Sequence, residues 1–304
     1  MLKKFYSLLL LGVVMSLVLF SQKASAYNTS EWMKSIDDNK RLSEISIPGS
    51  HDSGANHEHV INTAKCQDLK IAEQLESGVR YLDIRCRHFY DTFEIHHGSI
   101  HQHINFDDVL NACIPFLNNN PSETIIMCIK PEHTSVGNTR TFEETFDYYR
   151  AKNPDKWLLT DTIPTLGQSR GKIVLMRRFD AVNLPKGIDL TKWQDNTTFT
   201  IENNAKIKIQ DQYKVPDNDE KWSKIEDMYN EANQNSGDWW YINYCSGYRP
   251  LAFGIPDIYG VAKEINSNME KFFATNTSGK FGITVMDFAT EKRVKPIIQT
   301  NDLK

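Results

Sequence analysis

The chain has 304 residues, with 35 lysines and arginines against 39 aspartates and glutamates, and a formal net charge of −4 at pH 7. Residues 1–26 combine an early Lys3-Lys4 pair, an apolar run to about residue 20 and a small-residue ending, which is typical of a cleaved secretory signal peptide. The run is shorter than the ~20 residues of a spanning helix, which disfavours a membrane anchor. Because this segment holds three lysines and no acid, the remaining 278 residues carry 32 basic and 39 acidic side chains, or −7. That balance disfavours nucleic acid as a partner. The signal-peptide pattern predicts a secreted, extracellular protein.

Eight short runs rich in Ile, Val or aromatic residues predict β-strands, because turn residues bound them. In chain order they cover 44–47, 81–85, 93–97, 124–130, 172–178, 206–211, 240–246 and 282–287. Apolar residues at three- to four-residue spacing predict helices between them. These lie in 69–78, 106–119, 141–151, 222–233 and 261–273. The alternation predicts a single α/β barrel of the (β/α)8 TIM type over residues 27–304, and an open doubly wound sheet is the alternative.

The five cysteines of the predicted mature chain form no C-x-x-C pair, which weakens a structural zinc interpretation. They are Cys66, Cys86, Cys113, Cys128 and Cys245. An odd number leaves at least one thiol free or paired between chains. Cys66 precedes a predicted helix and Cys86 follows the second predicted strand, and we expect a disulfide between these two.

Each predicted strand ends at, or is closely followed by, a polar or ionisable residue. In order these are His51, Arg85, His97, Lys130, Arg178, Asp211, Ser246 and Asp287. In a barrel the carboxyl ends of the strands meet at one mouth, where active sites lie. The alternative explanation, that strands simply end where solvent begins, accounts less well for a set that is this rich in charge. The pattern therefore predicts a functional mouth.

The chemistry of that mouth favours an anionic substrate over a metal ion. All nine histidines lie between positions 51 and 133, and a metal site is one interpretation of them. Three cations, Arg85, Lys130 and Arg178, argue instead for a phosphate, which arginine binds through two parallel hydrogen bonds. Two histidines and an arginine suit phosphodiester cleavage, with one imidazole as base, the other as acid and Arg85 on the phosphate oxygens. Carboxylates that could orient the imidazoles are Asp52, Asp83 and Asp287.

Several ordered motifs resemble those of the small secreted phosphatidylinositol-specific phospholipases C, which share the X-type catalytic domain. They read "SIPGSHDSG", "QLESGVRYLDIRCR", "IHHG", "NPSETIIMCIK", "GKIVLMRR", "IQDQYKV" and "GITVMDFATEK". The resemblance runs from about residue 28 to near the C-terminus. It implies a distorted barrel that cleaves phosphatidylinositol without metal or cofactor, giving diacylglycerol and inositol 1,2-cyclic phosphate. Cleavage of glycosylated phosphatidylinositol anchors stays open.

The resemblance also implies a role for each residue. His51 is the base toward the inositol 2-hydroxyl, His97 is the acid toward the diacylglycerol oxygen, and Arg85 holds the phosphate in place of a calcium ligand. Asp287 supports His51, Asp52 assists the acid and Asp83 supports Arg85. The positions that match inositol-binding residues are Lys130, Arg178, Asp211 and Tyr213; for Tyr213 a place in the core is the equal alternative.

The chain departs from the best-known bacterial members in lacking a Trp over residues 55–67, where those proteins carry an interfacial one. We expect His57 and His59 in this stretch to be exposed loop residues rather than ligands. Membrane contact then falls to Phe253, Ile255 and Tyr259, with Ile258 beside them, in a Gly- and Pro-rich segment that a buried loop would explain equally well. The expected partner is phosphatidylinositol in membranes, met transiently by a monomer.

Two other functions remain as alternatives. One is a metal-dependent phosphodiesterase of the glycerophosphodiester type, which needs a carboxylate cluster where Arg85 stands. The other is a non-catalytic secreted binding protein on the same fold, which the intact His51, Arg85 and His97 disfavour.

Overall fold

The computed structural model describes residues 27–303. The predicted signal peptide, residues 1–26, and residue 304 lie outside the described residues. Across residues 27–303, none of the helices has both the length and the apolar character needed to cross a bilayer.

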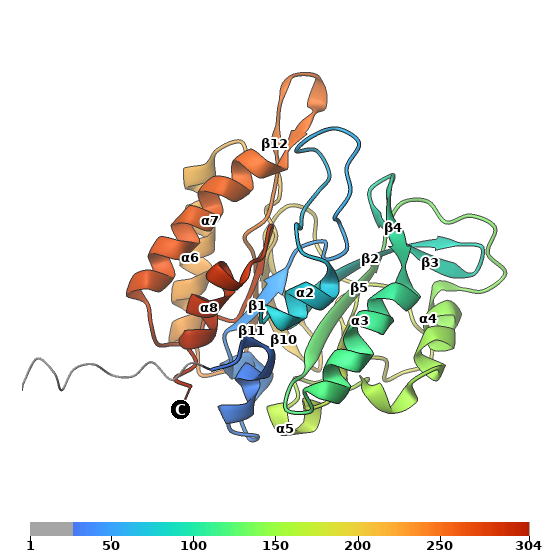
Figure 1. Ribbon diagram of the computed structural model, residues 1–304, viewed down its shortest axis with the longest axis horizontal. Helices are drawn as coiled ribbons and strands as arrows, with labels where there is room; N and C mark the ends of the chain where they lie inside the picture. Colours follow the sequence, from blue (N-terminus) through green and yellow to red (C-terminus); the bar gives the residue numbers. More distant parts are fainter. Residues whose placement is uncertain (1–26, 304) are drawn as a thin grey trace, which may run out of the picture.

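A curled, twelve-stranded sheet forms the centre of the molecule, with helices on its outside (Figure 1). Its parallel strands follow this spatial order: β6 (Trp157–Leu158), β7 (Ile173–Arg177), β5 (Ile125–Pro131), β2 (Tyr81–Phe89), β1 (Ile47–Ser50), β14 (Ile283–Met286), β11 (Trp240–Tyr244) and β10 (Lys206–Gln210). Strand β9 (Thr198–Glu202) pairs antiparallel with β10, and β8 (Ile188–Asp189) pairs with β7. Strands β3 (Thr92–His97) and β4 (Ile100–Asn105) form an antiparallel hairpin on β2.

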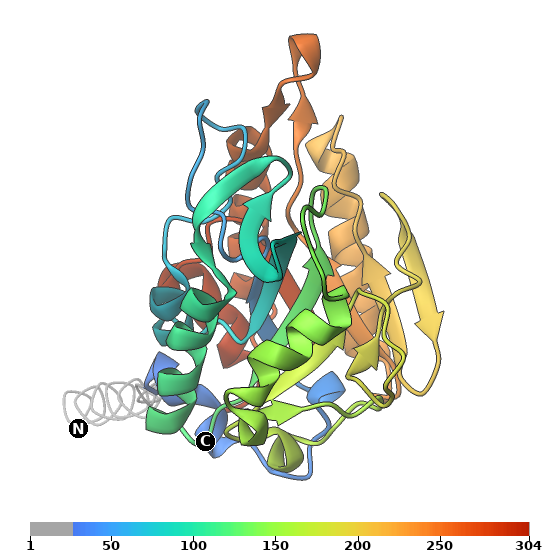
Figure 2. The same ribbon diagram turned by 90° about the vertical axis from the view of Figure 1, so that its right-hand side faces the viewer.

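The barrel is open at one seam. Within residues 27–303 no backbone pairing joins β9 to β6, the two ends of the strand order. Figure 2 shows β9, in gold, at the outer edge of the sheet. The prediction of a distorted (β/α)8 barrel is confirmed, and the distortion lies at this seam.

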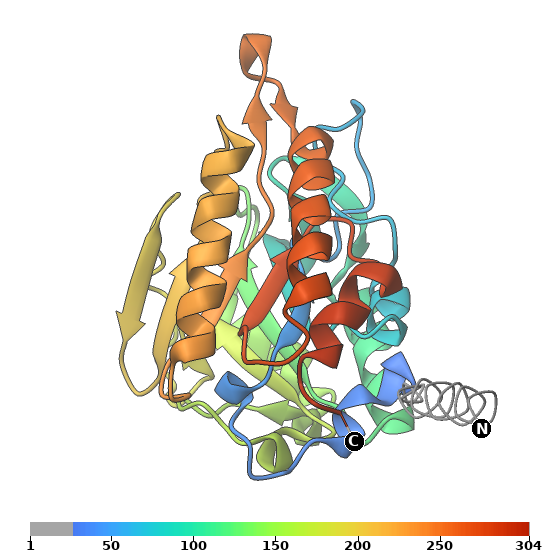
Figure 3. The ribbon, with the colours of Figure 1, turned by 90° about the vertical axis from the view of Figure 1, so that its left-hand side faces the viewer.

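Helices cover the outer face of the sheet between successive strands. They are α2 (Ile71–Glu76), α3 (Phe106–Asn119), α4 (Phe142–Ala151), α5 (Leu166–Ser169), α6 (Asn218–Gln234), α7 (Ile258–Thr275) and α8 (Glu291–Gln299), with 3-10 helices η1 (Thr29–Ser35), η2 (Leu42–Glu44), η3 (Pro154–Lys156) and η4 (Ala252–Gly254). Figure 3 shows α6, α7 and α8 together on the side of β11, β14 and β1. The apolar faces of the helices pack on strands that are buried on both sides, as parallel strands require.

Six of the eight predicted segments coincide with parallel strands, and two do not. The segment 44–47 begins in η2 and meets β1 (Ile47–Ser50) only at Ile47. The segment 93–97 belongs to β3, which pairs antiparallel with β2 and is not one of the parallel strands. The parallel strands that were not predicted are β6 and β8, which both pair with β7 and have two residues each, too few to produce a pattern in the sequence. Helix α8 was also missed.

Local sequence explains where the main helices begin. The Asn105 side chain accepts a hydrogen bond from Asp108 N and caps α3, and Thr141 accepts one from Glu144 N and caps α4. Asp257 caps α7 in the same way through Gly260 N. Helix α2 ends before Gly78, which adopts φ +105° as the sequence pattern anticipates.

A buried ion pair closes the amino-terminal side of the sheet. Arg80 Nη2 lies 2.9 Å from Glu123 Oε2, and both side chains are fully buried. Arg80 also donates to the carbonyls of Thr29 and Ser30, and Glu123 accepts from Met33 N, so the pair attaches η1 to β2 and β5. No pattern in the sequence indicated this pair.

Candidate active site

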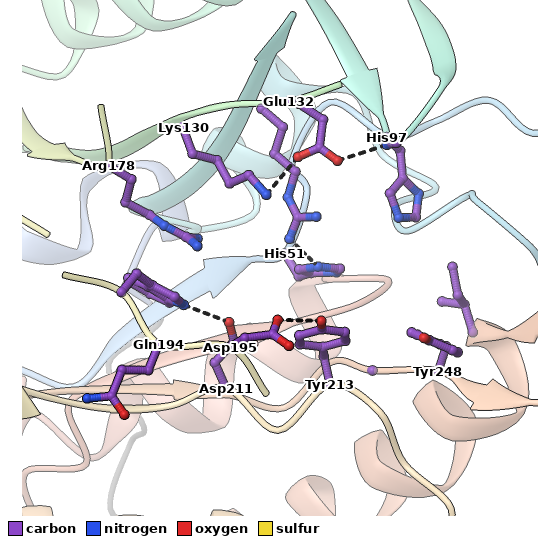
Figure 4. Close-up of a pocket in the computed structure, with 15 residues that line it drawn as sticks. His51, His97, Lys130, Glu132, Arg178, Gln194, Asp195, Asp211, Tyr213 and Tyr248 are labelled. Atoms are coloured by element: carbon purple, nitrogen blue, oxygen red, sulfur yellow. Dashed lines mark hydrogen bonds and ion pairs between the residues drawn. The ribbon is translucent and has the colours of Figure 1, made fainter. Parts of the chain in front are cut away.

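A cleft of about 400 Å³ opens at the carboxyl ends of the parallel strands (Figure 4). Seven of the predicted site residues line it: His51, Arg85, His97, Lys130, Arg178, Asp211 and Tyr213. The strand ends thus converge as the barrel prediction requires.

His51 follows the last residue of β1 and is held from three sides. Its backbone N donates to Met286 O, and its carbonyl accepts from Gln67 Nε2 at 2.8 Å. Its Nδ1 lies 2.7 Å from Oδ1 of the buried Asp287. Burial alone would lower the pKa of His51, but the Asp287 carboxylate outweighs burial and the pKa is raised. Asp287 therefore supports and orients the imidazole.

The other nitrogen of His51 is available as a proton acceptor. Arg85 Nη2 lies 2.8 Å from His51 Nε2. Because a guanidinium has only donors, this bond requires an unprotonated Nε2 and places the ring proton on Nδ1, toward Asp287. That tautomer is the one a general base at Nε2 needs.

Two buried carboxylates hold Arg85. Asp83 Oδ2 accepts from Nε at 3.2 Å and from Nη2 at 3.1 Å, and Asp52 Oδ2 lies 3.6 Å from Nε. Burial would raise the pKa of Asp83, but Arg85, together with His51, Arg178 and a hydrogen bond from Asp52 N, outweighs burial and holds that pKa at about 2. For Asp52, burial raises the pKa above its ordinary value in spite of Arg85. The guanidinium is therefore fixed before any phosphate arrives.

His97 approaches from a different element, the end of β3, just before the turn at Gly98 (φ +57°). Its Nδ1 donates to Ala64 O at 2.6 Å and lies 4.0 Å from Asp52 Oδ2. The His97 and His51 rings are 6.5 Å apart between centroids and nearly perpendicular, at 86°. Two imidazoles at this separation, with Arg85 against one of them, can serve the two sides of one phosphodiester.

Two further cations lie on the neighbouring strand ends. Lys130 Nζ is 2.7 Å from Glu132 Oε2, and burial, reinforced by Arg85, lowers the pKa of Lys130. Burial would raise the pKa of Glu132, but Arg85 and Lys130 outweigh it and hold that pKa at about 2. The Arg178 guanidinium lies 3.7 Å from the ring centroid of Trp193. This side of the cleft therefore presents two cationic groups, of which Lys130 is paired with a carboxylate.

The opposite wall offers carboxylates and hydroxyls. Asp211 Oδ2 accepts from Trp193 Nε1 at 2.9 Å, and Tyr213 donates its hydroxyl to Asp195 Oδ1 at 2.6 Å. Burial and the Asp195 carboxylate raise the pKa of Tyr213, so its hydroxyl stays protonated. Tyr213 lines the cleft, so the alternative that it belongs to the core is wrong.

Some residues at the mouth were missed, and one expected there lies elsewhere. The missed ones are Glu132, Trp193 and Asp195. Glu132 stands two residues after Lys130, and this spacing could have indicated that both side chains lie on the same face of the strand. No local sequence pattern indicates that Trp193 belongs to the site. Ser246 is buried and is not among the residues that line the cleft.

The expected Cys66–Cys86 disulfide is wrong, since all five cysteines are free and buried. The Cys66 thiol instead lies 3.9 Å from His97 Nδ1. Cys66 groups with His51 and Asp287, and also with Asp52 and His97, in sets whose ligand atoms lie within 4.8 Å. Burial raises the pKa of Cys66 well above its ordinary value, so a neutral thiol and the adjacent Arg85 make these sets poor metal sites.

A narrow hairpin projects from the molecule (Figure 1), and the residues that flank it, Tyr248 and Ile258, line the cleft. The hairpin consists of β12 (Arg249–Pro250), β13 (Pro256–Asp257) and the η4 turn between them. Phe253 at its tip is fully exposed at 102%, and Ile255 and Tyr259 are about half exposed. Ile258, by contrast, is buried, so the buried-loop alternative holds for that residue alone.

The loop over residues 51–70 lies beside this hairpin, and Ile258 N donates to Asn62 O across the two. His57 in this loop is partly buried and His59 is exposed. Val60 and Ile61 are exposed apolar residues next to them. The exposed apolar surface at this end is therefore contributed by two separate segments.

Comparisons with known proteins agree with this geometry. A family model described as "Phosphatidylinositol-specific phospholipase C, X domain" matches residues 39–179. The chain is 34% identical over 278 residues to the 1-phosphatidylinositol phosphodiesterase of Staphylococcus aureus (strain Newman), covering 85% of this chain and 88% of the relative. It is 30% identical over 298 residues to the enzyme of that name from Listeria monocytogenes, covering 91% and 86%. A solved structure of the S. aureus phosphatidylinositol-specific phospholipase C, from work on modulating its membrane binding, superposes with a TM-score of 0.82 at 32% identity, covering 90% of this chain and 98% of the other.

Proposed function

Because the chain belongs to the family of phosphatidylinositol-specific phospholipases C, we propose that it cleaves phosphatidylinositol at the phosphodiester bond to diacylglycerol. The observation that carries this proposal is the His51–Arg85–His97 arrangement in the cleft, with the two rings 6.5 Å apart and Arg85 bonded to His51. Glycosylated phosphatidylinositol anchors present the same inositol phosphodiester and are a second candidate substrate.

The reaction is an intramolecular transesterification. His51 Nε2 takes the proton of the inositol 2-hydroxyl, and that oxygen attacks the phosphorus. The bond from phosphorus to the diacylglycerol oxygen breaks, and His97 donates a proton to the leaving oxygen. The products are inositol 1,2-cyclic phosphate and diacylglycerol. The internal hydroxyl is favoured over water because it is already held next to the phosphorus.

Arg85 stabilises the charge that develops on the non-bridging phosphate oxygens. It remains cationic, because Asp83 and Asp52 raise its pKa further against the effect of burial. The same guanidinium contacts the base, so the positions of phosphate and base are coupled. Arg85 thus provides the positive charge that a metal ion provides in other phosphodiesterases.

The remaining cleft residues suit the inositol ring. Lys130 and Arg178 are donors on one wall, and the Asp211 carboxylate and the Tyr213 hydroxyl face them on the other. A polyhydroxylated ring needs both donors and acceptors, and its apolar face can stack on an aromatic ring. These four side chains give specificity for the headgroup.

Membrane contact is made by the exposed end of the molecule. Phe253 and Ile255 lie on the hairpin, and Tyr259 lies in the first turn of α7 at its base. Ile258, next to Tyr259, lines the cleft, so insertion of the three exposed side chains into a bilayer brings the cleft to the headgroup layer. The net charge of −7 outside residues 1–26 favours apolar insertion over electrostatic adsorption. Residues 27–304 act as one secreted catalytic domain, a monomer that binds the membrane transiently.

Phosphorus NMR of phosphatidylinositol incubated with the protein in EDTA tests this function. The expected first product is inositol 1,2-cyclic phosphate, at a rate that EDTA leaves unchanged. Inositol 1-phosphate as the first product would refute the internal attack. Activity that EDTA abolishes and calcium restores would favour the metal-dependent alternative, and no turnover at all would favour a binding protein.

A further inference from the structure

Three side chains with metal-ligating atoms meet on the β3–β4 hairpin. Glu94 and His96 are two residues apart in β3, and although the pairing with β4 shifts register between them, Glu94 Oε2 lies 3.3 Å from His96 Nε2. His101 in β4 is the register partner of His96. One ligand atom from each lies within 4.8 Å of the other two. His97, the next residue after His96, lines the cleft, so this cluster is separate from the catalytic residues.

His96 is a buried imidazole whose hydrogen bonding is incomplete. Its side chain is 2% exposed, and within residues 27–303 its Nδ1 has no hydrogen-bond partner. Its Nε2 lies 3.3 Å from Glu94 Oε2. A carboxylate oxygen and a ring nitrogen that both present lone pairs repel each other unless a proton or a metal ion lies between them. Buried polar groups in folded proteins are usually satisfied. A ring proton on Nε2 satisfies the contact with Glu94, so the free lone pair of His96 lies on Nδ1, where a cation can bind.

The cluster is accessible from solvent. A cavity of about 280 Å³ lies against the hairpin and is lined by Glu94 and His101, together with Asp107 and Asp108. Asp107 is paired with Lys152, whereas Asp108 adds negative charge beside the α3 cap. A cavity with acidic walls raises the local concentration of cations and gives them a path to the ligands.

We propose that Glu94, His96 and His101 bind one divalent transition-metal ion, of which Zn²⁺ is the natural example. Two imidazoles and one carboxylate are a donor set suited to zinc, whereas calcium and magnesium require oxygen donors. Zinc bonds of ~2.1 Å place the ligand atoms of a tetrahedral site roughly 3.4 Å apart. The ligand atoms here lie within 4.8 Å of one another, so they must move slightly closer together to bind zinc. Glu94 and His101 are partly exposed and can rotate, while the buried His96 stays fixed.

The bound ion would link β3 to β4 across the Gly98 turn. It would therefore restrain the strand that presents His97 to the cleft, without touching the substrate. This metal ion is not needed for the phosphodiester chemistry, so a test of zinc binding is independent of a test of the proposed phospholipase activity.

Titration calorimetry and thermal unfolding test the site. Protein lacking residues 1–26 and stripped with EDTA is titrated with ZnCl₂ and, in parallel, with CoCl₂, whose visible absorption reports its ligands. We expect one zinc ion per chain, a higher Tm with zinc, and cobalt bands of a nitrogen–oxygen site. His101→Gln and Glu94→Gln should each weaken zinc binding by at least about tenfold, since even partners of a metal ligand contribute that much.

Two variants serve as matched controls. His59→Gln removes an exposed histidine outside the cluster, and Cys66→Ala removes the thiol shared by the ligand sets in the cleft. Both should bind zinc as the unsubstituted protein does. Equal zinc affinity in the unsubstituted protein and in folded His101→Gln and Glu94→Gln would overturn the proposal. It would be overturned equally by zinc binding that Cys66→Ala abolishes, or by no binding at millimolar zinc.

Discussion

Replacement of Phe253 by serine should separate membrane binding from catalysis. The Phe253 side chain is fully exposed, so it contributes almost nothing to the folded core. It has φ +62°, and serine at this position keeps a β-carbon and therefore the same backbone restraint. The free energy of unfolding should stay within about 0.5 kcal/mol of its original value.

The magnitude of the binding loss follows from the same exposure. Transfer of a fully exposed aromatic side chain into an apolar environment is favourable by about 1.5–3 kcal/mol. Since about 1.4 kcal/mol corresponds to a tenfold change in affinity, Phe253→Ser should weaken vesicle binding by roughly ten- to a hundredfold. Tyr259 is half exposed, so adding Tyr259→Ser should cause a smaller further loss.

The assay is sedimentation of protein with vesicles that contain phosphatidylinositol, together with turnover of a soluble inositol phosphodiester. Binding should fall while soluble turnover is retained. Val182→Ser is a matched control, because Val182 is also highly exposed, at 86%, but lies outside the β12–β13 hairpin. Its backbone N donates a hydrogen bond to Glu143 of α4. Unchanged vesicle binding by Phe253→Ser, or an equal loss in Val182→Ser, would refute the reasoning.

Three other substitutions test the remaining parts of the structure. Arg85→Lys keeps the positive charge but loses the planar guanidinium that hydrogen-bonds to Asp83. The kcat should fall at least about a hundredfold while the Tm stays nearly unchanged, and a rate near that of the original enzyme would contradict the role of Arg85. Asp287→Asn should lower kcat by ~10²–10⁴-fold. This substitution removes the carboxylate that raises the pKa of His51, so the acid limb of the pH–rate profile should move to lower pH. An acid limb that does not move would argue against His51 as the base. Glu123→Ala leaves Arg80 buried without its partner and should lower the free energy of unfolding by about 3–5 kcal/mol in urea titrations; a change below about 1 kcal/mol would show that the pair is dispensable.

The barrel could be predicted because its strands are buried on both faces and therefore form continuous apolar runs. β5 and β7 are clear examples, and their sequences carry the signal without any tertiary information. The failures have physical causes. β6 is held as a strand by its pairing with β7, not by its own two residues, and β3 has the composition of a barrel strand while pairing antiparallel.

The candidate site likewise contains residues that the sequence could predict and residues that it could not. His51 and Lys130 could be found because they lie at or next to strand ends, which a parallel barrel brings together. Arg85 lies in the middle of β2, but at the level where its parallel pairing with β5 ends. The stacking of Trp193 on Arg178 and the approach of Cys66 to His97 join segments distant in sequence, and no local period indicates either contact. The exposure of Phe253 depends on the β12–β13 hairpin projecting away from the core, which its apolar composition alone does not indicate.

The position of β1 in the sheet has a consequence for the order of folding. β1 lies between β2, which follows it closely in the chain, and β14, which begins 236 residues after β1 does. Residue pairs such as Ile47 with Ile283 close a loop of nearly the whole chain, and contacts of such large sequence separation form slowly. During synthesis one edge of β1 stays unpaired until the last strand emerges. A nascent chain of this topology therefore completes its sheet only near the end of translation, which extends the period in which it is open to aggregation.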